Sequence, residues 1–315
     1  MFANYKKAFE RLSGQVPVIA EKYEIPKTFV WLGALCSYIR YGVTPNEYLG
    51  WQFYAKSHLE KNTFYSARRY KKYEKMLNDP KFYDVFWKKE IFNKTFSDFI
   101  SRDWLFVPES SDNEIYSFIN SHTKVIVKPT ALSAGRGIHV YNNETIEDLR
   151  LGEVLLEECI QQSEELYLLN PTSVNTIRVY TMIDRNGDPH VLSASIRVGG
   201  VGSTTDNFHS GGVGYPIDVE HGVVCGAGAD MLGRRFFYHP GSNVKLIGFE
   251  VPRWKELLEY VFKACKVIPT ARMIAWDVAI TETGFDMVEG NYNGDPGFMQ
   301  TPLIKGTWFE IKKLI

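Results

Sequence analysis

The stretch MIAWDVAITETGFDMVEGN, residues 273–291, places two carboxylates and a carboxamide where they can act together. Apolar and polar residues alternate on both sides of Thr283-Gly284, which predicts two strands joined by a turn. Antiparallel pairing about that turn brings Asp277 close to Glu289 or Asn291. Oxygen ligands of this kind suit Mg²⁺, and burying them among apolar neighbours is costly unless a cation neutralises them. An ordinary polar strand end is the alternative.

A second segment, KPTALSAGRGI at residues 128–138, has the composition of a phosphate-binding loop. Lys128 ends an apolar strand, and the small residues after it let backbone N–H groups wrap phosphate oxygens. The segment is not a Walker A motif, because no Gly-Lys-Ser/Thr follows the loop. It is not a Rossmann fingerprint either, because its glycines lead into a strand rather than a helix. A Gly-rich hairpin tip without a ligand is the alternative.

Three further segments could complete such a site. The apolar strand EVLLEECI ends at Glu157 and Glu158, where backbone groups could contact a purine edge, although a buried strand with a polar end is the simpler interpretation. Arg178 and Arg197 each lie within an apolar strand, a position that arginine rarely takes without an anionic partner. In the segment TTDNFHSGGVGYPID, residues 204–218, Asn207, Gly211 and Gly212 are expected to form a flexible tip after the second of these strands.

The sequence offers no convincing nucleophile. Cys159 lies on a strand that is expected to be buried, and Ser210 beside His209 is interpreted as a loop pair rather than part of a triad. The 4 cysteines are scattered without a Cys-x-x-Cys pair, so neither a zinc site nor a disulfide framework is indicated. The chemistry therefore has to come from charge and positioning.

The elements that hold these residues fall into three predicted regions. Residues 1–92 are expected to be helical, with a capping box at Thr44-Pro45-Asn46-Glu47 and dense aromatic residues that pack the region. Residues 93–162 mix helices and strands around the Gly-rich loop, and residues 163–315 are dominated by hairpins. Because strands and helices do not alternate as β-α-β units, the pattern favours α+β over a doubly wound parallel sheet.

Composition and charge narrow the class of protein. The chain of 315 residues has a formal net charge of −1, which argues against nucleic acid or an anionic membrane as the main partner. The most apolar stretch, TFVWLGALCSYI, is too short to span a bilayer, so no membrane span is expected. The start, MFANYKKAFERL, lacks the features of a signal peptide. A soluble cytoplasmic protein is predicted.

The order of these motifs resembles the ATP-grasp superfamily. The chain looks most like its sugar-transfer-associated branch, and it is similar also to the glutamate ligases that modify proteins. The resemblance covers about residues 93–300. It implies an ATP-grasp fold of two α+β lobes, at 93–162 and 163–315, with nucleotide between them. Many members begin with a Rossmann-like domain, whereas residues 1–92 here form a helical N-terminal region.

The resemblance also implies a role for each motif. Asp277, Glu289 and Asn291 match the ligands of two Mg²⁺ ions, for which Mn²⁺ is a possible substitute, and Arg178 and Arg197 match catalytic positions near the transferred phosphate. Nucleotide contacts are implied for Lys94, Lys128, Ser133, Gly135, Arg136, Gly137, Glu157, Glu158, Ile160, Glu165 and Met287. Substrate contacts are expected from Asn207, His209, Gly211, Gly212, Asn293 and Asp295.

The chemistry implied by the resemblance is ATP-dependent ligation of a carboxylate to an amine. ATP phosphorylates the carboxylate, and the amine attacks the acyl phosphate to form an amide. The branch suggests small-molecule substrates in cell-surface polysaccharide synthesis, with a sugar acid or amino sugar coupled to an amino acid; this step is analogy alone. A kinase acting on a hydroxyl and a non-catalytic nucleotide-binding module remain alternatives.

Overall fold

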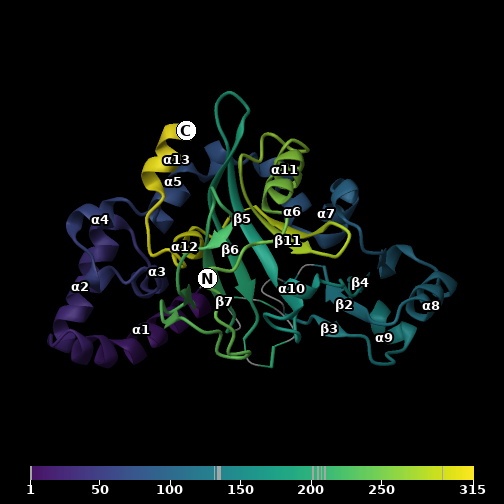
Figure 1. The fold of residues 1–315 in the computed structure, drawn as a ribbon, viewed down its shortest axis with the longest axis horizontal. Coiled ribbons are helices and arrows are strands. Elements are labelled where there is room, and N and C mark those ends of the chain that lie inside the picture. The colour runs from purple at the N-terminus through teal and green to yellow at the C-terminus, as the bar shows by residue number, and fades with distance from the viewer. Residues whose placement is uncertain are drawn as a thin grey trace.

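Two antiparallel sheets form the centre of the protein, and helices surround them (Figure 1). The structure is a computed structural model that describes every residue except 1, 131, 133–135, 201, 204, 205, 207, 209, 210 and 293, and it leaves the side chains of residues 2–5 undescribed. Every strand pairing among the described residues is antiparallel. The predicted α+β class is therefore confirmed.

The N-terminal region is helical, as predicted. The predicted capping box is present, because Thr44 N–H donates to Glu47 Oε2 at 2.7 Å while Thr44 Oγ1 accepts from Glu47 N–H at 3.3 Å. No helix in the described part of the chain is both long and apolar enough to cross a membrane. The helices are α1 (Phe2–Lys22), α2 (Lys27–Tyr41), α3 (Pro45–Gly50), α4 (His58–Asn62), α5 (Ala67–Leu77), α6 (Tyr83–Trp87) and α7 (Lys89–Thr95).

The smaller sheet has the strand order β1-β4-β2-β3 and forms one end of the molecule (Figure 1). Its helices pack Ile115 and Leu149 against Val127 and Leu156 in a core of its own. Strand β1 was not foreseen in the sequence, because three residues are too few to show a period. The elements are β1 (Trp104–Phe106), α8 (Asp112–Ser121), β2 (Val125–Pro129), β3 (His139–Val140), α9 (Ile146–Arg150) and β4 (Val154–Glu158).

The larger sheet has the order β10-β9-β7-β6-β5-β11-β12, with β8 paired to β7. Strand β5 (Thr176–Ile183) alternates between two cores: Ile177 and Val179 pack under α11, whereas Tyr180 and Met182 pack under α5, α12 and α13. The strands are β5 (Thr176–Ile183), β6 (Pro189–Val198), β7 (Val213–Asp218), β8 (Val223–Val224), β9 (Gly228–Ala229), β10 (Arg235–Phe236), β11 (Met273–Ile280) and β12 (Phe285–Asn291). The helices are α10 (Glu164–Tyr167), α11 (Trp254–Cys265), α12 (Pro296–Gln300) and α13 (Trp308–Leu314).

One arginine between the two sheets ties them together. Arg102 Nε donates to Glu157 Oε2 on β4 at 2.7 Å, and Arg102 Nη1 donates to Asp286 on β12. All three side chains are buried. Burial by itself would lower the pKa of Arg102, but the two carboxylates outweigh it and hold that pKa above its ordinary value. With Lys128, which also binds Glu157, the two carboxylates and two cations form a charge-neutral cluster that fixes the smaller sheet to the edge of the larger one.

Replacing Arg102 tests this connection. Arg102→Met leaves two buried carboxylates without their shared cation, so we expect the free energy of unfolding to fall by about 3–5 kcal/mol. The matched control is Lys94→Met, which removes an ion pair with Glu109 whose partners are about half exposed. That change is expected to cost about 0–1 kcal/mol. Urea unfolding measures both, and equal stability of the two variants would contradict the proposed role of Arg102.

Candidate functional site

Four side chains lie in one row across the larger sheet. The strand register places Ser195 of β6 opposite Arg178 of β5, Arg178 opposite Asp277 of β11, and Asp277 opposite Glu289 of β12. The prediction that the final hairpin brings Asp277 close to Glu289 is therefore confirmed. Directly opposite residues on one face of a sheet are in side-chain contact, so Arg178, Asp277 and Glu289 form a continuous line of charge with Ser195 at its end.

Asp277 is held by two arginines from different strands. Arg178 donates to both of its oxygens, Nε to Oδ1 at 2.6 Å and Nη2 to Oδ2 at 2.5 Å, and Arg197 Nη1 donates to Oδ2 at 2.6 Å. Burial alone would raise the pKa of Asp277, but the guanidinium groups outweigh it and hold the pKa well below its usual range. Asp277 is therefore a fixed negative charge, and each arginine has the anionic partner that its position in an apolar strand requires.

Arg197 has a second carboxylate partner, Asp206. Its Nη2 lies 3.1 Å from Asp206 Oδ1, and Asp206 also accepts hydrogen bonds from the backbone N–H and hydroxyl of Thr176. Burial raises the pKa of Asp206, and the negative charge of Asp277 adds to that effect although Arg197 opposes it. Arg197 therefore bridges two carboxylates at the floor of the cleft between the sheets.

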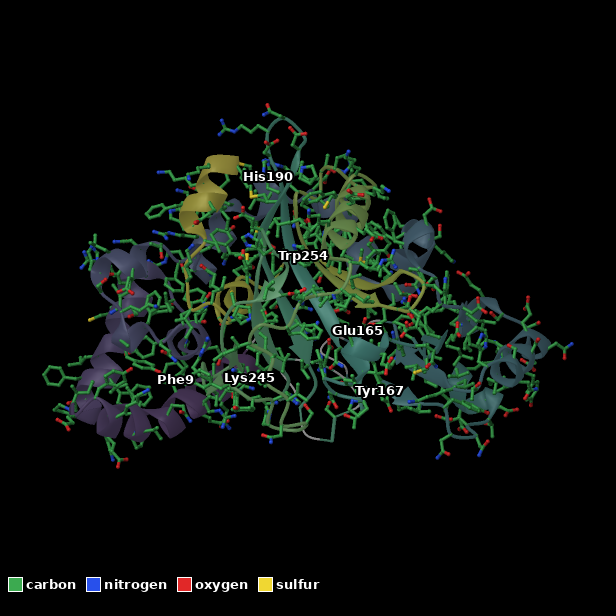
Figure 2. The ribbon with its side chains drawn as sticks, viewed as in Figure 1. Phe9, Glu165, Tyr167, His190, Lys245 and Trp254 are labelled. Atoms are coloured by element: carbon green, nitrogen blue, oxygen red, sulfur yellow. The ribbon has the colours of Figure 1, made fainter. Side chains whose placement is uncertain are left out.

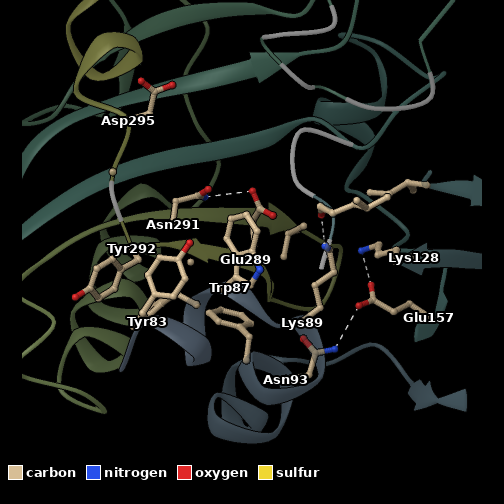
Figure 3. Close-up of a pocket in the computed structure, with 17 residues that line it drawn as sticks. Tyr83, Trp87, Lys89, Asn93, Lys128, Glu157, Glu289, Asn291, Tyr292 and Asp295 are labelled. Atoms are coloured by element: carbon tan, nitrogen blue, oxygen red, sulfur yellow. Dashed lines mark hydrogen bonds and ion pairs between the residues drawn. The ribbon is translucent and has the colours of Figure 1, made fainter. Parts of the chain in front are cut away.

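Glu289 and Asn291 complete a set of oxygen donors. Asn291 Nδ2 donates to Glu289 Oε1 at 3.2 Å, and Arg178 Nη2 lies 3.6 Å from the same oxygen (Figure 3). Burial within the cleft and the contact with Asp277 raise the pKa of Glu289 above its usual value, although 44% of its side-chain surface still faces solvent. Two touching carboxyls of this kind need a proton or a cation between them.

The donor set fits a divalent cation. A carboxylate offers about four lone-pair sites, and the arginines take three of those on Asp277, which leaves one for a metal bond. Glu289 opens into the cleft, and the amide of Asn291 can turn its oxygen toward the same point. Hard oxygen donors with room for water are what Mg²⁺ requires. The three residues named from the sequence are thus brought together.

Two adjoining cavities lie along this row. One of about 370 Å³ is lined by Glu158, Cys159, Ile160 and Tyr167 at one end and by Arg197, Asp206 and Asp277 at the other. The second, of about 250 Å³, contains the aromatic residues Tyr83 and Trp87 together with Asp295 (Figure 3). The two cavities share Lys128, Ile138, Glu157, Val288 and Glu289.

Two lysines face the shared part of the cleft. Lys128 Nζ donates to Glu157 Oε2 at 2.5 Å, while the same carboxylate also binds Arg102. Lys89 donates from α7 to the backbone oxygens of Pro129 at 3.0 Å, Thr130 at 3.3 Å and Leu132 at 2.7 Å (Figure 3). Burial lowers the pKa of Lys89, with Lys128 adding to this effect while Glu289 opposes it. Both ammonium groups thus lie at the loop that was predicted to bind phosphate, Lys128 paired with Glu157 and Lys89 bonded to the backbone of the loop.

Several sequence-predicted positions lie elsewhere. Lys94 points out of the cleft to Glu109, at 2.7 Å, and α7 presents Lys89 and Asn93 to the cavity instead. Met287 is fully buried in the core. Regular alternation along β12 would place it on the same face as Glu289, but a register shift opposite Asp277 and Val278 interrupts the alternation, and Val288 lines the cleft instead. These two positions correct the predicted nucleotide contacts.

Other predicted contacts do not line the two cavities. Glu165 lies exposed on α10, near Tyr167 (Figure 2). Arg178 is buried beside Asp277 and lines neither cavity. The positions of Arg136, Gly137, Gly211 and Gly212 are likewise not among the residues that line either cavity. The predicted positions Ser133, Gly135, Asn207, His209 and Asn293 lie outside the described residues.

Sequence reasoning missed part of the cleft. Asp206 lies within the segment TTDNFHSGG, which follows the strand of Arg197. Since Arg197 was expected to have an anionic partner, the sequence could have indicated Asp206 as that partner. Tyr83, Trp87 and Lys89 come from helices that looked like ordinary packing elements. Nothing in the local sequence distinguishes a residue that faces a cavity from one that faces a core when both sit on short helices.

Comparison with known proteins adds a family and a set of distant structures. The family model described as sugar-transfer associated ATP-grasp matches residues 147–309, just over half of the chain. This range includes β4, both strands of the final hairpin, and both arginine strands. Among curated proteins, no match is found.

Solved structures of ATP-grasp enzymes are similar only at a distance. The ATP-grasp ligase PsnB, complexed with a minimal precursor, is 14% identical, with 76% of this chain and 63% of that chain covered and a TM-score of 0.48. An L-amino acid ligase from Bacillus licheniformis is 11% identical, covering 69% and 43%, with a TM-score of 0.42. N5-carboxyaminoimidazole ribonucleotide synthetase from Thermotoga maritima is 11% identical, covering 71% and 48%, at 0.40. The chain spans less than two thirds of each of these proteins.

The carboxyl pair at the cleft floor can be tested without a substrate. Glu289→Gln removes the negative charge that touches Asp277, so without Mg²⁺ we expect the Tm to rise by about 1–3 °C. Addition of MgCl₂ is expected to raise the Tm of the natural protein but not of the variant, because the amide is a poor ligand. Differential scanning calorimetry measures both, with Glu109→Gln as an exposed control. An undiminished Mg²⁺ response in Glu289→Gln would contradict the metal assignment.

Proposed function

The chain belongs to the sugar-transfer associated ATP-grasp family, and from that premise we propose that it is an ATP- and Mg²⁺-dependent ligase joining a carboxylate to an amine. The observation that supports this most directly is the charged row Arg178–Asp277–Glu289, with Arg197 beside it, at the floor of two adjoining cavities. One cavity can take a nucleotide and the other an acceptor, with the charged row between them.

ATP fits the larger cavity in one orientation. Adenine would lie against the end of β4, where Glu158 and Ile160 line the wall, and the phosphates would extend toward Lys128 and Lys89. We assign residues 93–162 as the lobe that covers the nucleotide and residues 163–315 as the lobe that carries the metal site. Buried Arg102 would hold the two lobes in a fixed relative position, since it bonds to Glu157 on β4 and to Asp286 on β12.

Asp277, Glu289 and Asn291 would hold Mg²⁺, which Mn²⁺ would be able to replace because it accepts the same oxygen donors. A pair of such ions would neutralise the charge on the transferred phosphoryl group. Arg197 keeps Asp277 and Asp206 in place from the cleft side, and it can donate to an anion that enters between them. Arg178 acts indirectly, because it donates hydrogen bonds to both oxygens of Asp277 and so fixes that carboxylate in position.

The reaction that suits this arrangement has two steps. A substrate carboxylate oxygen attacks the γ-phosphorus of ATP, which forms an acyl phosphate and releases ADP. An amine then attacks the acyl carbon, which forms an amide and releases phosphate and a proton. Both steps need positioning and charge neutralisation rather than a protein nucleophile. Three residues that line the cleft supply cations along its length, Lys89, Lys128 and Arg197, and Arg178 acts through its bonds to Asp277.

The smaller cavity is proposed to bind the second substrate. Tyr83 and Trp87 of α6 stack at 5.7 Å with an angle of 17° between their planes, and Asp295 lies across the same cavity (Figure 3). A flat aromatic surface facing a carboxylate suits a ring that has an apolar face and an amino group. An amino sugar, or a sugar acid joined to an amino acid, meets that description and agrees with a role in cell-surface polysaccharide synthesis.

The proposed chemistry is tested by trapping the intermediate. With ATP, Mg²⁺ and a panel of sugar acids and amino acids, hydroxylamine is expected to convert the acyl phosphate to a hydroxamate, and ADP release is expected to depend on the carboxylate. A stable phosphoester without hydroxamate would instead identify a kinase acting on a hydroxyl. Nucleotide binding without any turnover across the panel would support a non-catalytic module.

The aromatic wall provides a test that separates the two cavities. Trp87 is partly exposed, so Trp87→Ala should leave the fold intact while removing the stacking surface. We expect the KM for the amine substrate to rise about 10-fold, the loss of one aromatic contact, and the KM for ATP to stay within 2-fold. Phe237→Ala removes an exposed aromatic ring outside both cavities and is the control. An equal effect on both KM values would place Trp87 outside the acceptor site.

A further inference from the structure

The outer face of helix α2 is apolar and has no partner among the described residues. Phe29, Leu32 and Ile39 are 63%, 55% and 62% exposed, and Cys36 between them is exposed as well. No charged residue occurs from Thr28 to Ile39. The opposite face of the helix, with Val30 and Ser37, is buried against the helical region. Helix α2 therefore presents one apolar face inward and another to solvent.

The spacing of the exposed residues is that of a helix-pairing seam. Phe29, Leu32, Cys36 and Ile39 follow one another at intervals of three, four and three residues. This is the a/d spacing that lets one helix lay its side chains between those of another. A flat surface such as a membrane would not select this narrow spacing, and the formal net charge of −1 gives the chain no general attraction to anionic lipid.

We propose that α2 is the interface of a homodimer, in which it packs antiparallel against α2 of a second copy. If the twofold axis passes near Ala34, Phe29 lies opposite Ile39 of the second copy and Leu32 lies opposite its Cys36. The seam is then self-complementary, which is what an isologous interface requires. Each apolar side chain of the stripe meets another apolar side chain, so the pairing leaves no buried charge.

The exposed area is sufficient for a stable dimer. Leu35 and Tyr38 of α2 border the seam, and Phe9 of α1 stacks on Trp31 at 6.3 Å, which extends the apolar surface beyond α2. Seven half-exposed large side chains, each offering about 100 Å² of surface, supply roughly 700 Å² per copy. That is close to the ~800 Å² per partner of a standard protein interface.

The position of α2 in the molecule agrees with this role. It lies at the outer edge of the helical region, at the opposite end of the molecule from the smaller sheet (Figure 1). A second copy bound there would leave the cleft between the sheets open in both protomers. The proposal is independent of the chemistry performed in the cleft, so it can be tested without substrates.

Solution mass and one charged substitution test the interface. Sedimentation velocity of the full chain at 1–100 µM is expected to show a species of twice 36.1 kDa. Leu32→Glu places a charge in the seam and is expected to weaken the dimer at least 100-fold. Because Leu32 is exposed in the monomer, the far-UV spectrum is expected to stay unchanged, and so is the Tm at a concentration where both proteins are monomeric. Leu59→Glu on α4, where the side chain is 79% exposed outside the seam, should leave the dimer intact.

Disulfide cross-linking tests the register. Leu32→Cys is expected to form an intermolecular disulfide with native Cys36 under mild oxidation, because the antiparallel pairing brings the two positions opposite each other. The link should disappear when Cys36→Ser is added, and Leu59→Cys should not form one. A monomer at 100 µM, a dimer unaffected by Leu32→Glu, or equal cross-linking at position 59 would overturn the proposal. Flotation of a monomeric protein with vesicles of phosphatidylglycerol, abolished by Leu32→Glu, would overturn it in favour of a membrane surface.

Discussion

Arg102 holds together two parts of the chain that each have a core of their own. Its guanidinium binds Glu157 on β4 of the smaller sheet and Asp286 on β12 of the larger one, with all three side chains buried. Burial of charge is costly unless partners are supplied at good geometry. The pairing therefore selects one arrangement of the two sheets over others, and the position of every group in the cleft depends on it.

Buried carboxylates are paired with cations along the cleft as well. Glu157 also binds Lys128, and burial would raise its pKa, but Arg102 and Lys128 outweigh this and hold the pKa of Glu157 well below its usual range. On the larger sheet, Asp277 is neutralised by Arg178 and Arg197. Glu289 differs, because its neighbour Asp277 already has its cations, and its own pKa is raised. Among these carboxylates, Glu289 would be stabilised most by a further cation, and it is therefore the centre of the proposed metal site.

The N-terminal helical region contributes side chains to the cleft. Helix α6 places Tyr83 and Trp87 in the wall of the smaller cavity, and α7 places Lys89 at the loop after β2. Residues outside the range matched by the family model thus build part of the cleft. Under the proposed function, substrate choice would depend on the helical region as much as on the family's shared elements. The proposed dimer interface on α2 and the proposed substrate site would then use different parts of one region.

Local sequence was sufficient for the hairpin and for the meeting of its two carboxylates. Alternation and a turn dipeptide placed Asp277 beside Glu289, because antiparallel pairing about a known turn leaves little freedom of register. The α+β class and the capping box at Thr44 followed from equally local patterns.

Tertiary structure alone decided the rest. A register shift in β12 buried Met287 and turned Val288 to the cleft, and α7 presented Lys89 rather than Lys94, because the direction of a side chain on a short helix depends on what packs against it. Pairing between residues more than fifty positions apart, such as Arg102 with Glu157 and Arg197 with Asp277, leaves no periodic trace in the sequence, since it arises only when the fold brings distant parts of the chain together.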